Sequence, residues 1–276
     1  MTSDSDVPGA TSPLVEHPRP VDSSPSVIAL RRSHDHLAAL VAGLDASGVR
    51  GPSYDKEWSI AQVLSHLGSQ AEIFGALLDA GVNGVDPPGQ ESFPPIWDAW
   101  NARSPEDQAT DSIAANGRFV RRLEGLDATQ RTSFRLLAFG MDLDLVMFLR
   151  LRISEHAVHS WDVAVALDPS ATVLPDAVEL LLDGLPQLAA RAGKPRGESL
   201  TVRVTTTDPE RALALVTDGV RLEPWSERDV AGVLRLTAEE LLRLVYGRLD
   251  ATHTSSARLD AEGISLDEIR AVFPGI

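Results

Sequence analysis

Before Pro169, apolar residues recur at every third or fourth position in four separate stretches of the chain. These stretches run over 26–44, 59–81, 104–123 and 142–167. Because this spacing places apolar side chains along one face of a helix, each stretch predicts an amphipathic helix. Four such helices, with one long connection among them, indicate a helical bundle.

Two of these helices begin at residues that are typical of helix N-termini. Ser59 and Gln62 fit a capping box, in which each side chain accepts a hydrogen bond from the other residue's backbone N–H. Ser104 is followed by Pro105 and two acidic residues, which favours the first turn of a helix. The second and third helices are therefore predicted to begin here.

The connection between the second and third helices, residues 82–103, is long and rich in proline. It carries three large aromatic side chains, Phe93, Trp97 and Trp100. Connections of this length inside a compact domain often form lids or binding loops. Local packing of the aromatic side chains is the more common arrangement, and the sequence leaves both interpretations open.

After Pro169 the pattern changes to shorter elements. A helix is expected over 176–192, and residues 200–205 alternate apolar and polar side chains as a strand does. Three more strands are expected at 212–216, 220–223 and 232–236, and two more helices at 237–246 and 266–273.

These elements predict an α+β fold in three parts. Residues 1–25 are rich in Ser, Pro, Asp and Thr and are expected to form a disordered tail. Residues 26–169 are expected to form the four-helix bundle, and residues 170–276 a small C-terminal α+β domain.

Composition and charge exclude several classes of function. Hydrophobic residues make up 43% of the 276, and the net charge of −15 repels nucleic acid and anionic membranes. No apolar run approaches the roughly 20 residues that span a bilayer. The first residues lack the basic start and apolar core of a secretory signal. We therefore expect a cytoplasmic protein with no nucleic-acid or membrane partner.

The chain contains no cysteine. This excludes disulfides, thiolate nucleophiles and thiolate metal ligands from the chain itself. Any thiol chemistry must therefore use a thiol supplied from outside.

Candidate metal ligands lie on two of the predicted helices. Glu155 and His159 are about one helical turn apart, so their side chains share a face and can bind one ion. His66, inside the second helix, is the candidate third ligand. Imidazole and carboxylate suit Zn²⁺, and three protein ligands leave a position open for water or substrate. Arg152 and Asp162, on the same stripe, are candidates for contacts that support the ligands.

The same residues also have simpler interpretations. A Glu and a His at this spacing usually form a solvated pair, and a single histidine beside an apolar face is usually a hydrogen-bonded core residue. His156 lies about 100° around the helix from Glu155 and is not expected to be a ligand. His34 has no partner in a ligand pattern and is expected at the surface.

Two segments resemble signatures of a known family. Residues 57–67 (Glu-Trp-Ser-Ile-Ala-Gln-Val-Leu-Ser-His-Leu) are similar to the pattern Trp-(Ser/Thr)-x-x-(Asp/Gln)-x-(Leu/Val)-x-His-Leu. Residues 155–162 (Glu-His-Ala-Val-His-Ser-Trp-Asp) are similar to Glu-x-x-x-His-x-Trp-Asp. Both patterns belong to the DinB-like, mycothiol-dependent maleylpyruvate isomerase family, and the resemblance covers roughly residues 26–169.

This resemblance implies a metal site at one end of a DinB-like four-helix bundle. The metal is usually zinc, and the matching ligands here are His66, Glu155 and His159. The family also has an active-site arginine near the end of the chain. Residues 241–248 look like the matching helix, so Arg248 is the candidate catalytic residue. A cation at a helix C-terminus is an equally ordinary explanation of Arg248.

The resemblance further implies a metal-dependent transferase or isomerase that uses mycothiol, a low-molecular-weight thiol, on a small electrophilic substrate. A metal deprotonates a thiol that coordinates it, and Arg248 is expected to hold a substrate carboxylate. Two alternatives remain open: a metal-dependent hydrolase with a metal-bound hydroxide, and a non-catalytic metal-binding regulatory or interaction protein. The sequence specifies neither the substrate, the metal in the cell nor the oligomeric state.

Overall fold

The computed structural model describes residues 23–55, 57–195, 199–254 and 256–275. Residues 1–22 of the predicted tail lie outside this range. Residues 24 and 25 belong to the first helix, α1, which spans Ser24–Ala42.

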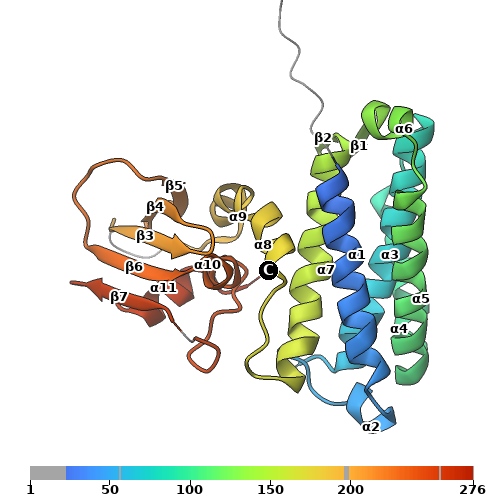
Figure 1. Ribbon diagram of the computed structural model, residues 1–276, viewed down its shortest axis with the longest axis horizontal. Coiled ribbons are helices and arrows are strands. Elements are labelled where there is room, and N and C mark those ends of the chain that lie inside the picture. The colour runs from blue at the N-terminus through green and yellow to red at the C-terminus, as the bar shows by residue number, and fades with distance from the viewer. Residues whose placement is uncertain (1–22, 56, 196–198, 255, 276) are drawn as a thin grey trace, which may run out of the picture.

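Four long helices form the N-terminal half and run side by side (Figure 1). They are α1, α3 (Ile60–Asn83), α5 (Pro105–Glu124) and α7 (Leu145–Leu167). Helix α3 packs against α5 and α7, and α1 packs against the same two helices. The four helices therefore share one core, and each overlaps the stretch in which the apolar periodicity predicts it.

The observed helix starts follow the capping residues. The Ser59 hydroxyl accepts a hydrogen bond from the Gln62 backbone N–H, and the Gln62 side chain accepts one from the Ser59 N–H. The Ser104 hydroxyl accepts a hydrogen bond from the backbone N–H of Asp107. Both predicted caps are confirmed.

The fourth long helix starts later than the sequence pattern suggests. Residues 136–138 and 141–143 pair as a two-stranded antiparallel hairpin, β1 (Leu136–Ala138) and β2 (Met141–Leu143). Asp144 then caps α7, and its side chain accepts a hydrogen bond from the Met147 N–H. The expected start at residue 142 thus falls inside a strand that is too short to show alternation.

The connection over 82–103 is mostly ordered as helix. It contains a 3₁₀ turn, η1 (Gln90–Ser92), and helix α4 (Phe93–Asn101). Trp100 packs into the core and is 1% exposed, while Trp97 is 40% exposed. Two further short helices, α2 (Ala46–Val49) and α6 (Ala128–Ser133), occupy other connections.

The C-terminal half is built on a five-stranded sheet in the order β5-β4-β3-β6-β7. Its strands are β3 (Thr201–Thr207), β4 (Arg211–Val216), β5 (Arg221–Pro224), β6 (Gly232–Thr237) and β7 (Arg258–Ala261). Strands β3 and β6 are parallel, and the other neighbours are antiparallel. Four of these strands were expected from the sequence, whereas β7 was not.

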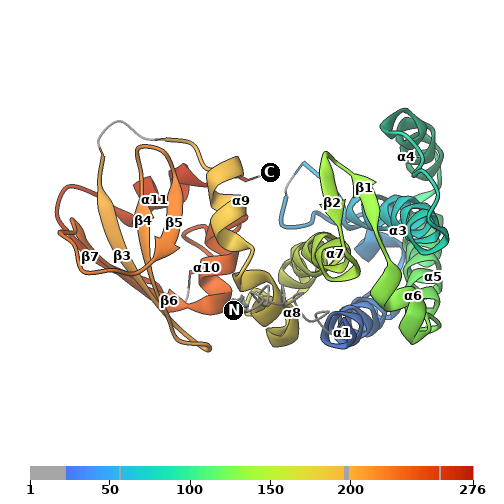
Figure 2. The same cartoon turned by 90° about the horizontal axis from the view of Figure 1, so that it is seen from above.

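Helices lie between this sheet and the bundle (Figures 1 and 2). The helix expected over 176–192 is divided into α8 (Pro175–Leu182) and α9 (Leu185–Ala192), because Gly184 and Pro186 interrupt it. Helix α10 (Ala238–Val245) packs on β3 and β6, and α8 packs on both α7 and α10. A last helix, α11, spans Leu266–Val272.

The helical N-terminal half and the sheet-containing C-terminal half confirm the predicted α+β class. Within the described residues, no helix has the length and apolar character needed to cross a bilayer.

Candidate metal centre

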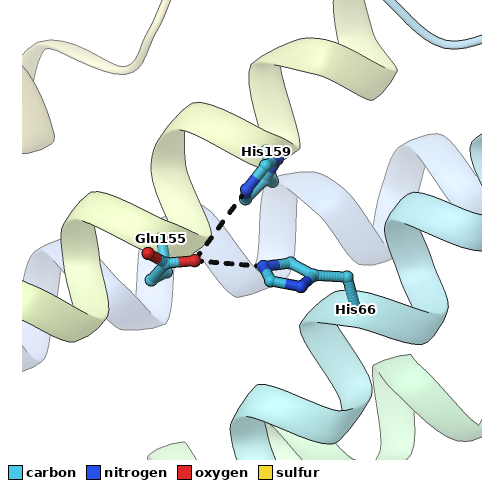
Figure 3. Close-up of side chains that lie close together, drawn as sticks. All are labelled: His66, Glu155 and His159. Carbon is cyan, nitrogen blue, oxygen red and sulfur yellow. Dashed lines mark hydrogen bonds and ion pairs between the residues drawn. The ribbon is translucent and has the colours of Figure 1, made fainter. Parts of the chain in front are cut away.

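Three side chains from two helices converge between α3 and α7 (Figure 3). His66 points from α3 toward Glu155 and His159 on α7. The His66 Nε2 atom lies 3.0 Å from Glu155 Oε2, and His159 Nε2 lies 3.8 Å from the same oxygen. One donor atom from each residue lies within 4.8 Å of the other two.

The local sequence explains this convergence. Glu155 and His159 are four positions apart on one continuous helix, which places them on the same face. His66 follows the capped start of α3 by less than two turns, so the cap fixes the point from which it projects. The side chains of all three are partly buried, with exposed fractions of 23% for His66, 35% for Glu155 and 20% for His159.

A carboxylate behind His159 determines which ring nitrogen faces the cluster. Asp162 Oδ2 lies 2.8 Å from His159 Nδ1. Because an ionised carboxylate only accepts, this contact assigns an N–H to Nδ1, and the other ring nitrogen, Nε2, faces Glu155. Carboxylate–histidine pairs of this kind orient metal-binding imidazoles in proteins.

Asp162 is itself held by the C-terminal half. The Arg248 guanidinium donates to both carboxylate oxygens, from Nε at 2.9 Å and from Nη2 at 3.0 Å. It also donates from Nη1 to the backbone oxygen of Tyr246 at 2.8 Å. Asp162 is 1% exposed, so this bidentate pair lies in the interior.

The pKa shifts favour the protonation states that metal ligands need. Burial lowers the pKa of His66 more than its hydrogen bond with Glu155 raises it, which favours the neutral imidazole. Burial alone would raise the pKa of Glu155, but the hydrogen bond with His66 and the nearby His159 outweigh it, so its pKa lies well below the usual range. A neutral histidine and an ionised carboxylate are the forms that bind a cation.

The donor spacing fits a zinc-sized cation. Zn²⁺ bonds of ~2.0–2.1 Å in tetrahedral geometry separate neighbouring ligand atoms by about 3.3 Å. The observed separations from Glu155 Oε2, 3.0 Å to His66 and 3.8 Å to His159, lie on either side of that value. The residues present therefore fit a three-ligand divalent site after small side-chain adjustments.

The cluster borders an open cavity of about 400 Å³. Besides the three candidate ligands, its walls include Ser154, Arg191, Tyr246 and Arg248. The bundle and the C-terminal half both contribute to this cavity. It places a cation-binding cluster and an arginine around a space large enough for a small molecule.

Comparison with known families bears on this arrangement. The family model of the mycothiol maleylpyruvate isomerase N-terminal domain matches residues 30–164, a range that contains all three candidate ligands. Residues 30–164 therefore correspond to the mycothiol maleylpyruvate isomerase N-terminal domain, in a match that spans just under half of the chain.

Solved structures share the fold of this chain. The crystal structure of a mycothiol-dependent maleylpyruvate isomerase is 13% identical in sequence, with a TM-score of 0.64 over 86% of this chain and 93% of that chain. A variant of such an isomerase with one histidine replaced by alanine gives the same values. The similarity thus extends beyond the N-terminal domain into the C-terminal half. No curated protein matches the chain.

The residues that the sequence singled out have different places in the structure. The structure brings His66, Glu155 and His159 together, and Asp162 supports His159. Arg152 is buried beside the cluster and donates to Asn116 and, at 3.5 Å, to the backbone oxygen of Leu67. Within the described residues, no hydrogen bond or ion pair joins it to the three candidate ligands.

Other cavity residues were not anticipated. Tyr246 and Ser154 form a hydrogen bond of 2.6 Å at the cavity wall. Trp97 and Trp58 border a further cavity of about 760 Å³ on another side of His66. Sequence spacing gives no signal for Tyr246 and Ser154, because they are 92 positions apart. Trp97 belongs to the aromatic connection for which a binding role was considered.

Proposed function

We propose that this protein is a metal-dependent, mycothiol-dependent transferase or isomerase that acts on a small electrophilic substrate. The observation that carries the proposal is the convergence of His66, Glu155 and His159 beside a cavity that also contains Arg248. The match to the mycothiol maleylpyruvate isomerase N-terminal domain supports the use of mycothiol, and the absence of cysteine means that the thiol must come from outside the chain. The proposed setting is the cytoplasm, where low-molecular-weight thiols stay reduced.

When bound, a divalent cation such as zinc lowers the pKa of a coordinated thiol, which is then a thiolate near neutral pH. His66 and His159 would supply neutral nitrogens, and Glu155 would supply one negative charge. Three protein ligands leave room for the thiol. Asp162 would keep His159 in the tautomer that binds through Nε2.

Arg248 would serve both the site and the substrate. Three of its N–H groups are engaged by Asp162 and Tyr246. A guanidinium has five N–H donors, so two are left for a substrate oxygen. We propose that these hold a substrate carboxylate while the Asp162 pair keeps the guanidinium in place.

The first experiment is elemental analysis of the purified protein beside three single variants. We expect about one equivalent of zinc or a similar metal in the wild type, and its loss in His66→Ala and Glu155→Ala with unchanged circular dichroism. His36→Ala, on α1 outside the cluster, should keep its metal. A wild type that stays metal-free after incubation with zinc would refute the proposal.

A second experiment separates thiol chemistry from hydrolysis at the same metal. The protein is substituted with cobalt and titrated with mycothiol. A sulfur-to-metal charge-transfer band that saturates with the thiol supports the proposed function. A loaded protein whose spectrum never responds to the thiol contradicts the thiol-dependent part.

A further inference from the structure

A separate, apolar cavity of about 350 Å³ adjoins the candidate metal centre. It lies between the β2–α7 segment of the bundle and the α8–α9 segment of the C-terminal half. Its walls are mainly apolar and include Met141, Leu143, Met147, Leu151, Leu181 and Leu188. Cavities of this size with apolar walls and a few polar groups are typical of small-molecule sites.

The apolar cavity meets the cavity of about 400 Å³ beside the candidate ligands at a defined place. Ser154, Arg191 and Tyr246 line both of them. The 2.6 Å hydrogen bond between Ser154 and Tyr246 joins the bundle to the C-terminal half at this junction. Because Ser154 directly precedes Glu155, the junction lies next to the candidate ligands.

Two arginines at the apolar cavity have no carboxylate partner. Arg150 and Arg191 form no hydrogen bond or ion pair with any other residue in the described part of the chain. Arg191 is exposed and Arg150 is half-buried, so both guanidinium groups can be reached from solvent. Unpaired guanidinium groups beside an apolar cavity suit a ligand that has an anionic group and an apolar body.

We propose that this apolar cavity binds the apolar body of the substrate, and that the substrate is a carboxylate with an aliphatic or aryl substituent. The carboxylate lies between Arg248 and Arg191, which both line the cavity beside the candidate ligands, and the apolar substituent extends among the leucine and methionine side chains. Arg150 adds positive potential at the same cavity. This inference rests on the proposed function, because it names the substrate class for that site.

The test is calorimetric titration of the full-length protein with decanoate, decanol and acetate. We expect decanoate to bind, decanol to bind at least fivefold more weakly, and acetate to give no measurable binding. Acetate also controls for a carboxylate that merely coordinates a metal. Equal binding of decanoate and decanol, or binding of acetate as tight as that of decanoate, would overturn the proposal.

Single variants locate the binding. Arg191→Gln should weaken decanoate binding by roughly fivefold, since a charge-assisted hydrogen bond is lost at an exposed position. Arg150→Gln should have a smaller effect. Leu188→Trp or Leu151→Phe, which fill the cavity, should weaken it by more than tenfold. Arg118→Gln, an exposed arginine on α5 that has no ion pair among the described residues, is the matched control and should change nothing.

The outcomes are separable from those of the proposed function. Decanoate binding that responds to Arg191→Gln and to both cavity-filling variants supports the inference whatever the metal content is. Decanoate binding that survives both filling variants, each verified as folded, refutes it and leaves the metal and thiol experiments untouched.

Discussion

At the scale of single residues, Asp162 is the centre of the site's organisation. Its two oxygens serve three hydrogen bonds, one to His159 and two to Arg248. Burial alone would raise the pKa of Asp162. The hydrogen bond from His159 and the positive charge of Arg248 lower this pKa by more than burial raises it, so the net shift is downward. A buried carboxylate that stays ionised holds one candidate ligand and one candidate catalytic residue at once.

Asp162→Asn should therefore weaken metal binding without removing a ligand. An asparagine oxygen still accepts a hydrogen bond from His159, but it carries no charge to raise the basicity of the imidazole. We expect zinc affinity to fall by roughly 10- to 100-fold, measured by competition with a chelating dye. Asp79→Asn, at an exposed ion pair with Arg122, should leave the affinity unchanged. Equal affinities for the wild type and Asp162→Asn would contradict this role.

His34 shows how tertiary packing changes a residue's behaviour. The prediction that it lies at the surface is wrong, since it is 7% exposed. Gly117 of α5 permits this close approach, because a Cβ there would lie 3.2 Å from the ring. Burial lowers the pKa of His34, although neighbouring Asp35 partly opposes the shift.

This shift predicts a pH dependence of stability. Unfolded histidine titrates near pH ~6.5, while the folded form titrates lower. Below that pH the unfolded chain binds more protons, so the contribution of His34 to the free energy of unfolding is lost as the pH falls. Urea unfolding between pH 7 and 5 should show a shallower loss of stability in His34→Gln than in the wild type. Parallel profiles would refute the assignment.

At the scale of elements, α3 is shaped by small residues on its packed faces. Gly68 faces Trp100 of α4, and a Cβ at that position would lie 2.2 Å from the indole ring. Gly81 faces Phe134 in the same way, at 2.3 Å. These close approaches allow the aromatic side chains to fill the core beside the helix.

Two glycines of α3 provide a matched pair of substitutions. Gly68→Ala should lower the free energy of unfolding by about 1–3 kcal/mol, because the new methyl group displaces Trp100. Gly75→Ala, in the same helix with nothing within 4 Å of the added Cβ, should raise it by about 0.5–1 kcal/mol. Denaturant titration measures both. A stabilising Gly68→Ala would show that α4 does not pack as described.

At the scale of the whole molecule, α7 connects the two halves. It packs against α1 and α3 in the bundle, against α8 on its other side, and it carries Glu155, His159 and Asp162. The buried Asp162–Arg248 pair and the Ser154–Tyr246 hydrogen bond both join it to the segment that follows α10. The cavity beside the candidate metal centre therefore depends on both halves.

Removing the arginine should uncouple the halves. In Arg248→Gln the nearly inaccessible Asp162 loses its charged partner, and we expect the free energy of unfolding to fall by about 3 kcal/mol. Arg31→Gln removes a more exposed pair with Glu124 and should cost less than about 1 kcal/mol. A double-mutant cycle with Asp162→Asn measures the coupling directly. An equal loss of unfolding free energy in Arg248→Gln and Arg31→Gln would mean that the buried pair stabilises the fold no more than the exposed pair does.

The sequence by itself determined the features that depend on local periodicity. The four long helices follow from apolar spacing, and the start of α3 follows from Ser59 and Gln62. Glu155 and His159 share a face because a helix repeats every 3.6 residues. His66 could be named with them because the motif around it resembles that of a family, and its position inside a capped helix fits that role.

Tertiary structure alone decided the contacts between distant segments. Asp162 and Arg248 are 86 positions apart, and Ser154 and Tyr246 are 92 apart. Other features also arise only when packed elements meet. They are the β1–β2 hairpin, the folding of the long connection into α4, the burial of His34 and the apolar cavity. Local patterns report which face of an element is apolar, but not which element covers it, because that choice depends on the burial and charge pairing of the whole chain.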